Sequence, residues 1–159
     1  MAELRDVVAY LCKHYPHNHE LSKARLTKLV YLADWKAAIE GRRQMTPIQW
    51  VFNRYGPYVE DVYQLAMDDA AFNVENDWTL FGNPKETISL KREFDMTSLT
   101  AEDKRTLDHV INQTQRLSWD EFIQLVYSTY PVLTGTRGAQ MDLVAAAEKY
   151  TTMKVEPAA

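Results

Sequence analysis

Apolar positions recur at helical spacing in two segments near the beginning of the chain. Residues 2–15 place one apolar stripe on a helix, and Pro16 ends it; the stripe consists of Leu4, Val7, Val8, Leu11 and Tyr15. Residues 22–40 repeat the pattern and end at Gly41, a residue type favoured just after a helix. Each predicted helix has one apolar face, so we expect the two to pack on each other or on a shared core.

The stretch from residue 46 to residue 53 carries signals for two different elements. Thr46 can cap a helix, Pro47 is tolerated in a first turn, and Gln49 stands where a capping box needs it. These features predict a short helix over residues 47–53. The apolar residues also alternate, however, at Ile48, Trp50 and Phe52, so a strand is the competing interpretation.

Residues 57 to about 69 are expected to form the next helix. Gly56 before Pro57 breaks the preceding element, and Glu60 and Asp61 are acidic residues of the kind that favour a helix start. The apolar face of this helix would bury four residues: Val59, Val62, Tyr63 and Ala66.

Between residues 73 and 94 the helical period disappears. Residues 78–81 and 87–91 are short β-prone runs around the turn-forming sequence Gly82-Asn83-Pro84-Lys85. The pattern predicts a small β-hairpin.

Two pairs with Ser/Thr-x-x-acid spacing indicate helix starts in the second half, namely Thr100 with Asp103 and Ser118 with Glu121. They predict helices over residues 101–116 and 119–128, the second closed by Pro131. A last helix is expected over residues 141–150, followed by a short C-terminal tail, residues 151–159, that has little to bury.

Composition fits one mainly α, single compact helical domain with a small β-hairpin, covering residues 1–150. The chain has 159 residues, of which 46% are hydrophobic and 25% charged, close to the averages for a soluble domain. Three of the first six residues are charged, and no apolar run approaches the roughly 18 residues needed to span a bilayer. The single cysteine, Cys12, fits a reducing compartment. We therefore expect a cytoplasmic protein without a membrane segment.

Charge limits the classes of partner. The 18 basic and 22 acidic side chains give a net charge of −4, the wrong sign for a protein that binds phosphate backbones over its whole surface. The charge is uneven, because residues 22–43 are rich in Lys and Arg whereas residues 60–77 are acidic. A nucleic-acid-binding regulator that uses the basic segment is therefore possible, although not indicated.

The common motifs of enzymes and cofactor sites do not occur. The five glycines lack the spacing of a dinucleotide or P-loop turn, and the sequence contains no GxSxG, HExxH or CxxC. His14, His17 and His19 lie around Pro16 and are interpreted as exposed turn residues rather than metal ligands. We expect no catalytic residue, no cofactor and no metal.

One pair of motifs resembles a known family. Leu26-x-Lys28-Leu29-x-Tyr31-x-Ala33, followed by Trp50, then Tyr55-Gly56-Pro57 and Tyr63, resembles the Panacea domain, known also as the SocA-like antitoxin domain. The resemblance implies the antitoxin half of a toxin–antitoxin pair, a non-enzymatic protein that neutralises a cognate protein toxin by binding it. Family members accompany very different toxins, so the resemblance does not identify the toxin.

The candidate partner-binding residues come from the same motifs. They are Lys28, Tyr31, Asp34, Trp35, Arg54, Tyr55, Gly56, Pro57 and Tyr58. Five of them, Lys28, Trp35, Arg54, Tyr55 and Tyr58, would form a partly exposed aromatic and basic patch of the kind enriched at interfaces. Two alternatives stay open: the helical residues belong to the core, and Gly56-Pro57 is only a rigid turn. An adaptor that delivers the toxin to a protease is a further functional alternative.

Overall fold

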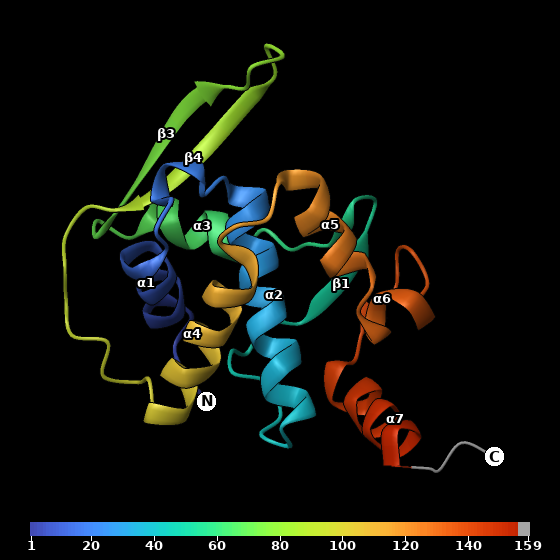
Figure 1. Cartoon of the computed structure of the whole chain (residues 1–159). Coiled ribbons are helices and arrows are strands. Elements are labelled where there is room, and N and C mark those ends of the chain that lie inside the picture. The colour runs from blue at the N-terminus through green and yellow to red at the C-terminus, as the bar shows by residue number, and fades with distance from the viewer. Residues whose placement is uncertain (156–159) are drawn as a thin grey trace.

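Helix α2 (Lys23–Ile39) runs through the middle of the molecule (Figure 1). The computed structural model describes residues 1–155. Helix α2 begins at Ser22, whose hydroxyl accepts a hydrogen bond from the backbone N–H of Arg25, and Gly41 follows its end with a φ of 81°. Helices α1 (Leu4–His14), α3 (Asp61–Asp68), α4 (Ala101–Thr114) and α7 (Leu143–Val155) all contact it. Covered on several sides, α2 is buried around most of its circumference rather than along one apolar face.

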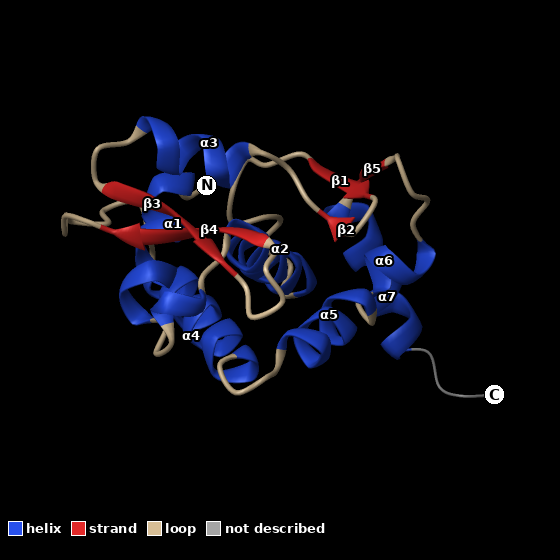
Figure 2. Cartoon of the chain, turned by 90° about the horizontal axis from the view of Figure 1, so that it is seen from above, coloured by secondary structure: helices blue, strands red, loops and turns tan. Residues whose placement is uncertain are grey.

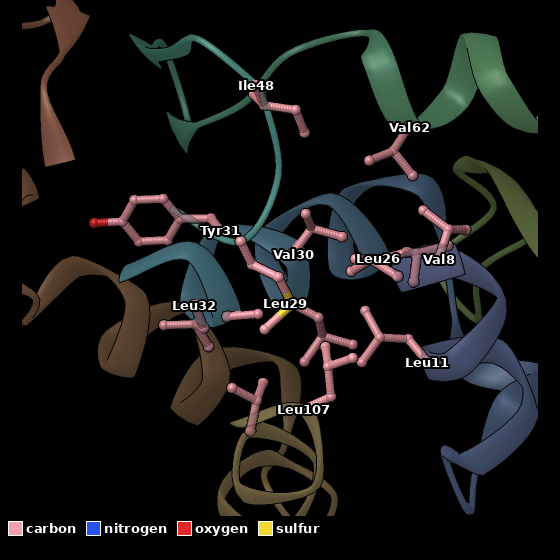
Figure 3. Packing of buried hydrophobic residues seen from close by; sticks show 14 of the residues in the cluster. Val8, Leu11, Leu26, Leu29, Val30, Tyr31, Leu32, Ile48, Val62 and Leu107 are labelled. Carbon is pink, nitrogen blue, oxygen red and sulfur yellow. The ribbon is translucent and has the colours of Figure 1, made fainter. Parts of the chain in front are cut away.

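The hydrophobic core lies where α1 and α4 meet α2. Leu11, Leu26, Leu29 and Leu107 are fully buried there, and their side chains point toward one another in Figure 3. The helices predicted over residues 2–15 and 101–116 are confirmed as α1 and α4, each with slightly shorter bounds.

The two expected capping boxes are also confirmed. The pairs are Thr100 with Asp103 and Ser118 with Glu121. In each pair, the hydroxyl of the first residue accepts a hydrogen bond from the backbone N–H of the acidic residue, and the carboxylate accepts one from the backbone N–H of the first residue. They begin α4 and α5 (Trp119–Tyr127).

The predicted helix over residues 47–53 is wrong, and the strand interpretation is correct. Strand β1 (Trp50–Asn53) pairs antiparallel with β2 (Gly56–Pro57) and with β5 (Gln140–Met141). Figure 2 shows this small sheet beside the C-terminal helices, away from the longer hairpin. Partners about ninety positions away, together with alternating burial, outweigh the local capping signals.

The following helix starts at Asp61, later than expected, because Pro57 belongs to β2. The turn that precedes this helix depends on Gly56, which has a φ of 94°. A Cβ atom at this position would lie 2.6 Å from Cε1 of Tyr127, so side-chain packing as well as backbone conformation requires glycine here.

The expected hairpin is confirmed, but its strands lie elsewhere in the sequence. Strands β3 (Phe72–Trp78) and β4 (Pro84–Leu90) pair in register from Phe72 with Leu90 to Trp78 with Pro84. Residues 79–83 therefore form the tip, whereas 78–81 were expected to be a strand. Buried residues at the base, Phe72 and Ile88, anchor the ribbon, and the rest projects from the helical body (Figure 1).

The C-terminal part continues through α6 (Tyr130–Thr134), β5 and α7, and a 3-10 turn, η1 (Asn18–Glu20), lies between α1 and α2. Pro131 lies in the first turn of α6, a position that tolerates proline, so it begins a helix rather than only ending one. Helix α7 runs past Tyr150 to Val155, which corrects the expected start of the tail. Residues 156–159 of that tail lie outside the described residues. The expected mainly α fold is confirmed.

Candidate functional site

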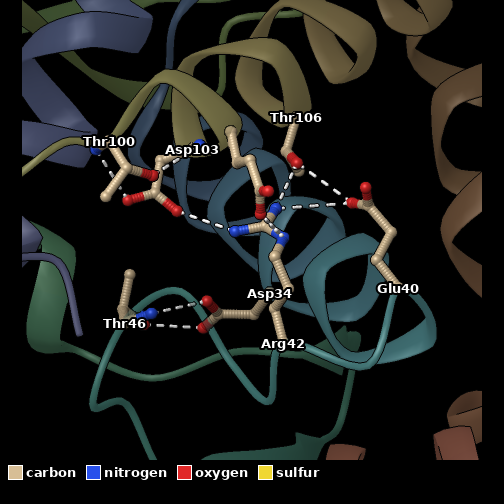
Figure 4. Close-up of polar contacts among 8 residues, drawn as sticks. Asp34, Glu40, Arg42, Thr46, Thr100, Asp103 and Thr106 are labelled. Carbon is tan, nitrogen blue, oxygen red and sulfur yellow. Dashed lines mark hydrogen bonds and ion pairs between the residues drawn. The ribbon is translucent and has the colours of Figure 1, made fainter.

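A buried carboxylate joins α2 to the strand that follows. Asp34 is fully buried, and it accepts hydrogen bonds from the backbone N–H of Thr46 at 2.8 Å, from Oγ1 of Thr46 at 2.6 Å and from Nε1 of Trp50 at 2.8 Å. Figure 4 shows the two bonds with Thr46. Burial raises the pKa of Asp34 to about 6, while the hydrogen bonds with Thr46 and Trp50 act in the opposite direction. Asp34 therefore fixes where β1 begins.

Tyr31 and Trp35, about one turn apart on α2, contact the C-terminal elements. The hydroxyls of Tyr31 and Thr129 are hydrogen-bonded at 2.8 Å, and the ring of Tyr31 packs edge-on against Trp50 with centroids 5.5 Å apart. The ring of Trp35 packs against Tyr150 at 5.6 Å. Both side chains are buried, so they hold α6 and α7 against α2.

Lys28 is an unusual interior residue. Its side chain is 2% exposed, and within the described residues it has no hydrogen-bond or ion-pair partner. The ring of Tyr58 lies beside it, with its centroid 5.6 Å from Nζ, in a cation–π arrangement. Burial lowers the pKa of Lys28 to about 8. The ammonium group is therefore held in the interior at a cost in stability.

The outer members of the candidate set lie on the β1–β2 turn. Tyr55 is 68% exposed, and the guanidinium of Arg54 is 5.5 Å from its ring centroid. Gly56 and Pro57 are buried beneath the turn, and Tyr58 is half-buried. Burial raises the pKa of Tyr58, and nearby Lys23 lowers it.

The structure thus divides the expected exposed patch. Arg54 and Tyr55 are at the surface, but Lys28 and Trp35 lie in the interior, so the patch does not exist as one surface. The reason is that other helices cover α2 on several sides, which its sequence pattern alone does not show. Whether the surface members bind a partner stays a prediction.

Sequence reasoning missed an exposed apolar cluster at the hairpin tip, formed by Trp78, Leu80 and Phe81. Trp78 is 68% exposed, and Leu80 and Phe81 are almost entirely exposed. Grouped large apolar residues on a surface are typical of binding sites. The signal was present, because three apolar residues stand directly before the turn sequence Gly82-Asn83-Pro84.

Three of the six Lys and Arg side chains of the basic segment, residues 22–43, are engaged within the fold. Arg42 donates to Asp103 at 2.9 Å (Figure 4). It also forms an ion pair with Glu102 at 3.4 Å. Lys23 pairs with Glu86 at 2.8 Å. Lys28 is buried, so three of the cations in this segment serve the fold.

The structure gives no support for metal binding or nucleophilic chemistry at the residues considered for them, within the part of the chain that it describes. Cys12 is buried, and burial raises its pKa to about 12, which keeps the thiol protonated and inert. Within residues 1–155, no three His, Cys, Asp or Glu side chains gather closely enough to hold a metal ion. In the same part of the chain, no helix is long and apolar enough to cross a membrane.

Comparison with family models gives one match, to the family described as "Antitoxin SocA-like, Panacea domain", over residues 26–131. The chain belongs to the Panacea domain family. The matched region of this Panacea domain begins on α2, contains Lys28, Asp34 and the hairpin tip, and ends in α6. Comparison with curated proteins and with solved structures gave no match.

Replacing Asp34 tests the anchor between α2 and β1. In Asp34→Asn, an amide NH₂ replaces one acceptor oxygen and faces a donor, so the free energy of unfolding should fall by about 1–3 kcal/mol. Because burial raises the pKa of Asp34, the folded state holds the proton more tightly than the unfolded state does. Its contribution to stability therefore falls as pH rises from about 4 to about 6.

The loss caused by Asp34→Asn should accordingly be larger at pH 4.5 than at pH 7, as measured by urea unfolding. The control is Asp95→Asn, at an exposed position. Equal stability of Asp34→Asn and the parent chain at both pH values would contradict the anchor.

Replacing Lys28 tests the cost of its burial. Because the pKa of Lys28 falls to about 8, the protonated form costs stability at pH 7, and this cost disappears as pH rises toward 10.5. Lys28→Met should raise the free energy of unfolding at pH 7 by up to about 3 kcal/mol and by much less at pH 10. Urea unfolding at both pH values measures this, with exposed Lys104→Met as the control. If Lys28→Met is less stable than the parent chain at pH 7, the prediction is contradicted, because favourable interactions of the ammonium group then outweigh the cost of its burial.

Proposed function

We propose that this chain is the antitoxin of a toxin–antitoxin pair, acting in the cytoplasm, and that it neutralises a cognate protein toxin by direct binding without catalysis. The observation that carries the proposal is the family match over residues 26–131. That match covers most of α2 together with the β1–β2 turn and the β3–β4 hairpin, so the proposal concerns the main body of the chain.

The hairpin tip is the best-suited surface for the toxin. Trp78, Leu80 and Phe81 are held on a two-stranded ribbon that projects from the body (Figure 1). Aromatic side chains that enter a pocket of a partner dominate many protein interfaces. The ribbon beside them is acidic at exposed Glu75 and Asp77, which would surround the apolar contact with a polar rim. We infer that the toxin accepts the tip in an apolar groove with a basic edge.

The β1–β2 turn is proposed as a second contact, through Arg54 and Tyr55. Its backbone is fixed from below, because Gly56 packs against Tyr127 and Trp50 is bound to Asp34. The buried candidates act differently. Tyr31 and Asp34 would support the turn, and Trp35 would hold α7 against α2, rather than touch the toxin.

Lys28 supports a binding role by a separate argument. A buried ammonium group without a counter-ion lowers stability, and residues that cost stability are concentrated where function requires them. Lys28 lies against Tyr58, close to the β1–β2 turn. We propose that its charge is used when the toxin binds there.

Co-expression with the toxin encoded next to this chain tests the function. Growth should be rescued, and the two proteins should elute together in gel filtration. No rescue and no complex with the unaltered chain would overturn the proposed function. If the toxin's lifetime after translational arrest falls in the presence of this chain, delivery to a protease replaces simple sequestration.

A triple variant tests the hairpin. Trp78→Ser, Leu80→Ser and Phe81→Ser together should leave the melting temperature unchanged, because all three are exposed, and should weaken toxin binding by roughly 100-fold or more. The matched control replaces three exposed apolar residues elsewhere, Met67, Leu133 and Met153, with serine. Equal binding by the hairpin variant and the control would contradict a role for the tip while leaving the antitoxin function intact.

A further inference from the structure

A cavity of about 990 Å³ lies where the first turns of α2 and α5 face the β3–β4 hairpin. This volume is within the range of small-molecule sites in proteins. Lys23, Arg25, Lys85, Arg116 and Trp119 are among its lining residues. Thr79 of the hairpin tip lines it, but the exposed apolar residues Trp78, Leu80 and Phe81 and the candidate residues on the β1–β2 turn do not.

The cavity has an excess of positive charge. Its lining includes four Lys and Arg side chains and two carboxylates, those of Glu86 and Glu121. Glu86 is paired with Lys23 at 2.8 Å, and Glu121 accepts from the backbone N–H of Ser118 at 3.0 Å. Glu121 keeps its negative charge, so the four cations and two carboxylates leave a formal net charge of +2, and no carboxylate of the described residues forms an ion pair with Arg25, Lys85 or Arg116.

Arg25 is the most informative of the three because it is only 6% exposed. One of its N–H groups donates to the hydroxyl of Tyr15 at 3.4 Å, and the guanidinium lies 5.0 Å from the ring centroid of Phe122. A guanidinium has five N–H donors, and the others of Arg25 have no hydrogen-bond partner within residues 1–155. A buried cation without a counter-ion is unfavourable, so the site is suited to an anion from outside.

The N-termini of two helices add to the positive electrostatic potential of the cavity. Ser22 and Ala24 at the start of α2, and Ser118 at the start of α5, also line the cavity. The first turn of a helix has backbone N–H groups without helical partners and carries a partial positive charge, which favours phosphate groups. Several positive groups around one cavity match a ligand with several adjacent negative charges.

The remaining lining suits an aromatic ring. Trp119 is 43% exposed, and Leu117 and Pro84 lie on the same lining. A flat base can pack against such a surface while its phosphates reach the cations. We propose that this cavity binds a nucleoside polyphosphate, with its phosphates on Arg25, Lys85 and Arg116 and its base against Trp119. The proposal does not depend on the antitoxin function.

Isothermal titration calorimetry of the purified chain with ATP, GTP and pyrophosphate tests this site. ATP or GTP should bind with a micromolar Kd at 50 mM salt, and Lys85→Ala with Arg116→Ala should weaken binding at least tenfold. The control removes the same charge at exposed positions outside the cavity, Lys104→Ala with Arg105→Ala, and should bind like the parent chain. Trp119→Leu should weaken ATP or GTP binding more than pyrophosphate binding, because the ring packs against the base as well as lying 5.6 Å from the Arg25 guanidinium.

Three results would overturn the proposal. The first is no binding of ATP or GTP up to millimolar concentration. The second is equal weakening by the cavity variant and by the control, which would show non-specific attraction. The third is tighter binding of a glutamate-rich peptide than of either nucleotide, which would assign the cavity to an acidic protein segment. Because the titration needs no toxin, its result is independent of the co-expression experiment.

Discussion

The arrangement of this protein depends on one buried carboxylate. Asp34, on the central helix, is bound by Thr46 and Trp50, and these contacts determine where the chain leaves its loop and enters β1. The pairings of β1 with β2 and β5 follow from that position. A carboxylate buried among apolar side chains is stable only with such donors, so the interaction selects one register of the loop.

The family motifs therefore describe a scaffold more than a contact surface. Leu26, Leu29, Tyr31 and Trp50 are buried, and Gly56 is required by its close approach to Tyr127. What the scaffold presents outward is the β1–β2 turn and the β3–β4 hairpin. A body that is held together from within leaves these projections available for the partner contact that we propose.

The sequence predicted the elements whose signals are local. The helix starts at Thr100 and Ser118 depend on residues three positions apart, and the structure confirms both. The strand at Trp50 could not be decided locally, because its partner Met141 is about ninety positions away. The end of α7 was missed for a similar reason, since Tyr150 packs against Trp35 and Tyr130.

The candidate site was predictable only in part. The motif residues were recognised, but a helical pattern does not show how many neighbours cover a helix, so Lys28 and Trp35 were expected nearer the surface than they lie. The hairpin tip was assigned to a strand, because register within a hairpin depends on which residues anchor its base. The cavity beside Arg25 joins residues from three distant segments and leaves no pattern in any one of them.

The central claim is that a rigid interior presents the hairpin tip to a protein toxin. Amide hydrogen exchange of the chain alone and in complex with its toxin tests this most directly. The account predicts new protection at residues 78–83, with smaller protection at the β1–β2 turn. It predicts no change in the exchange of α2, which the burial of this helix should keep slow in the free chain as well. A stable complex in which the hairpin stays unprotected while other surfaces, such as α4 or α7, become protected would contradict it.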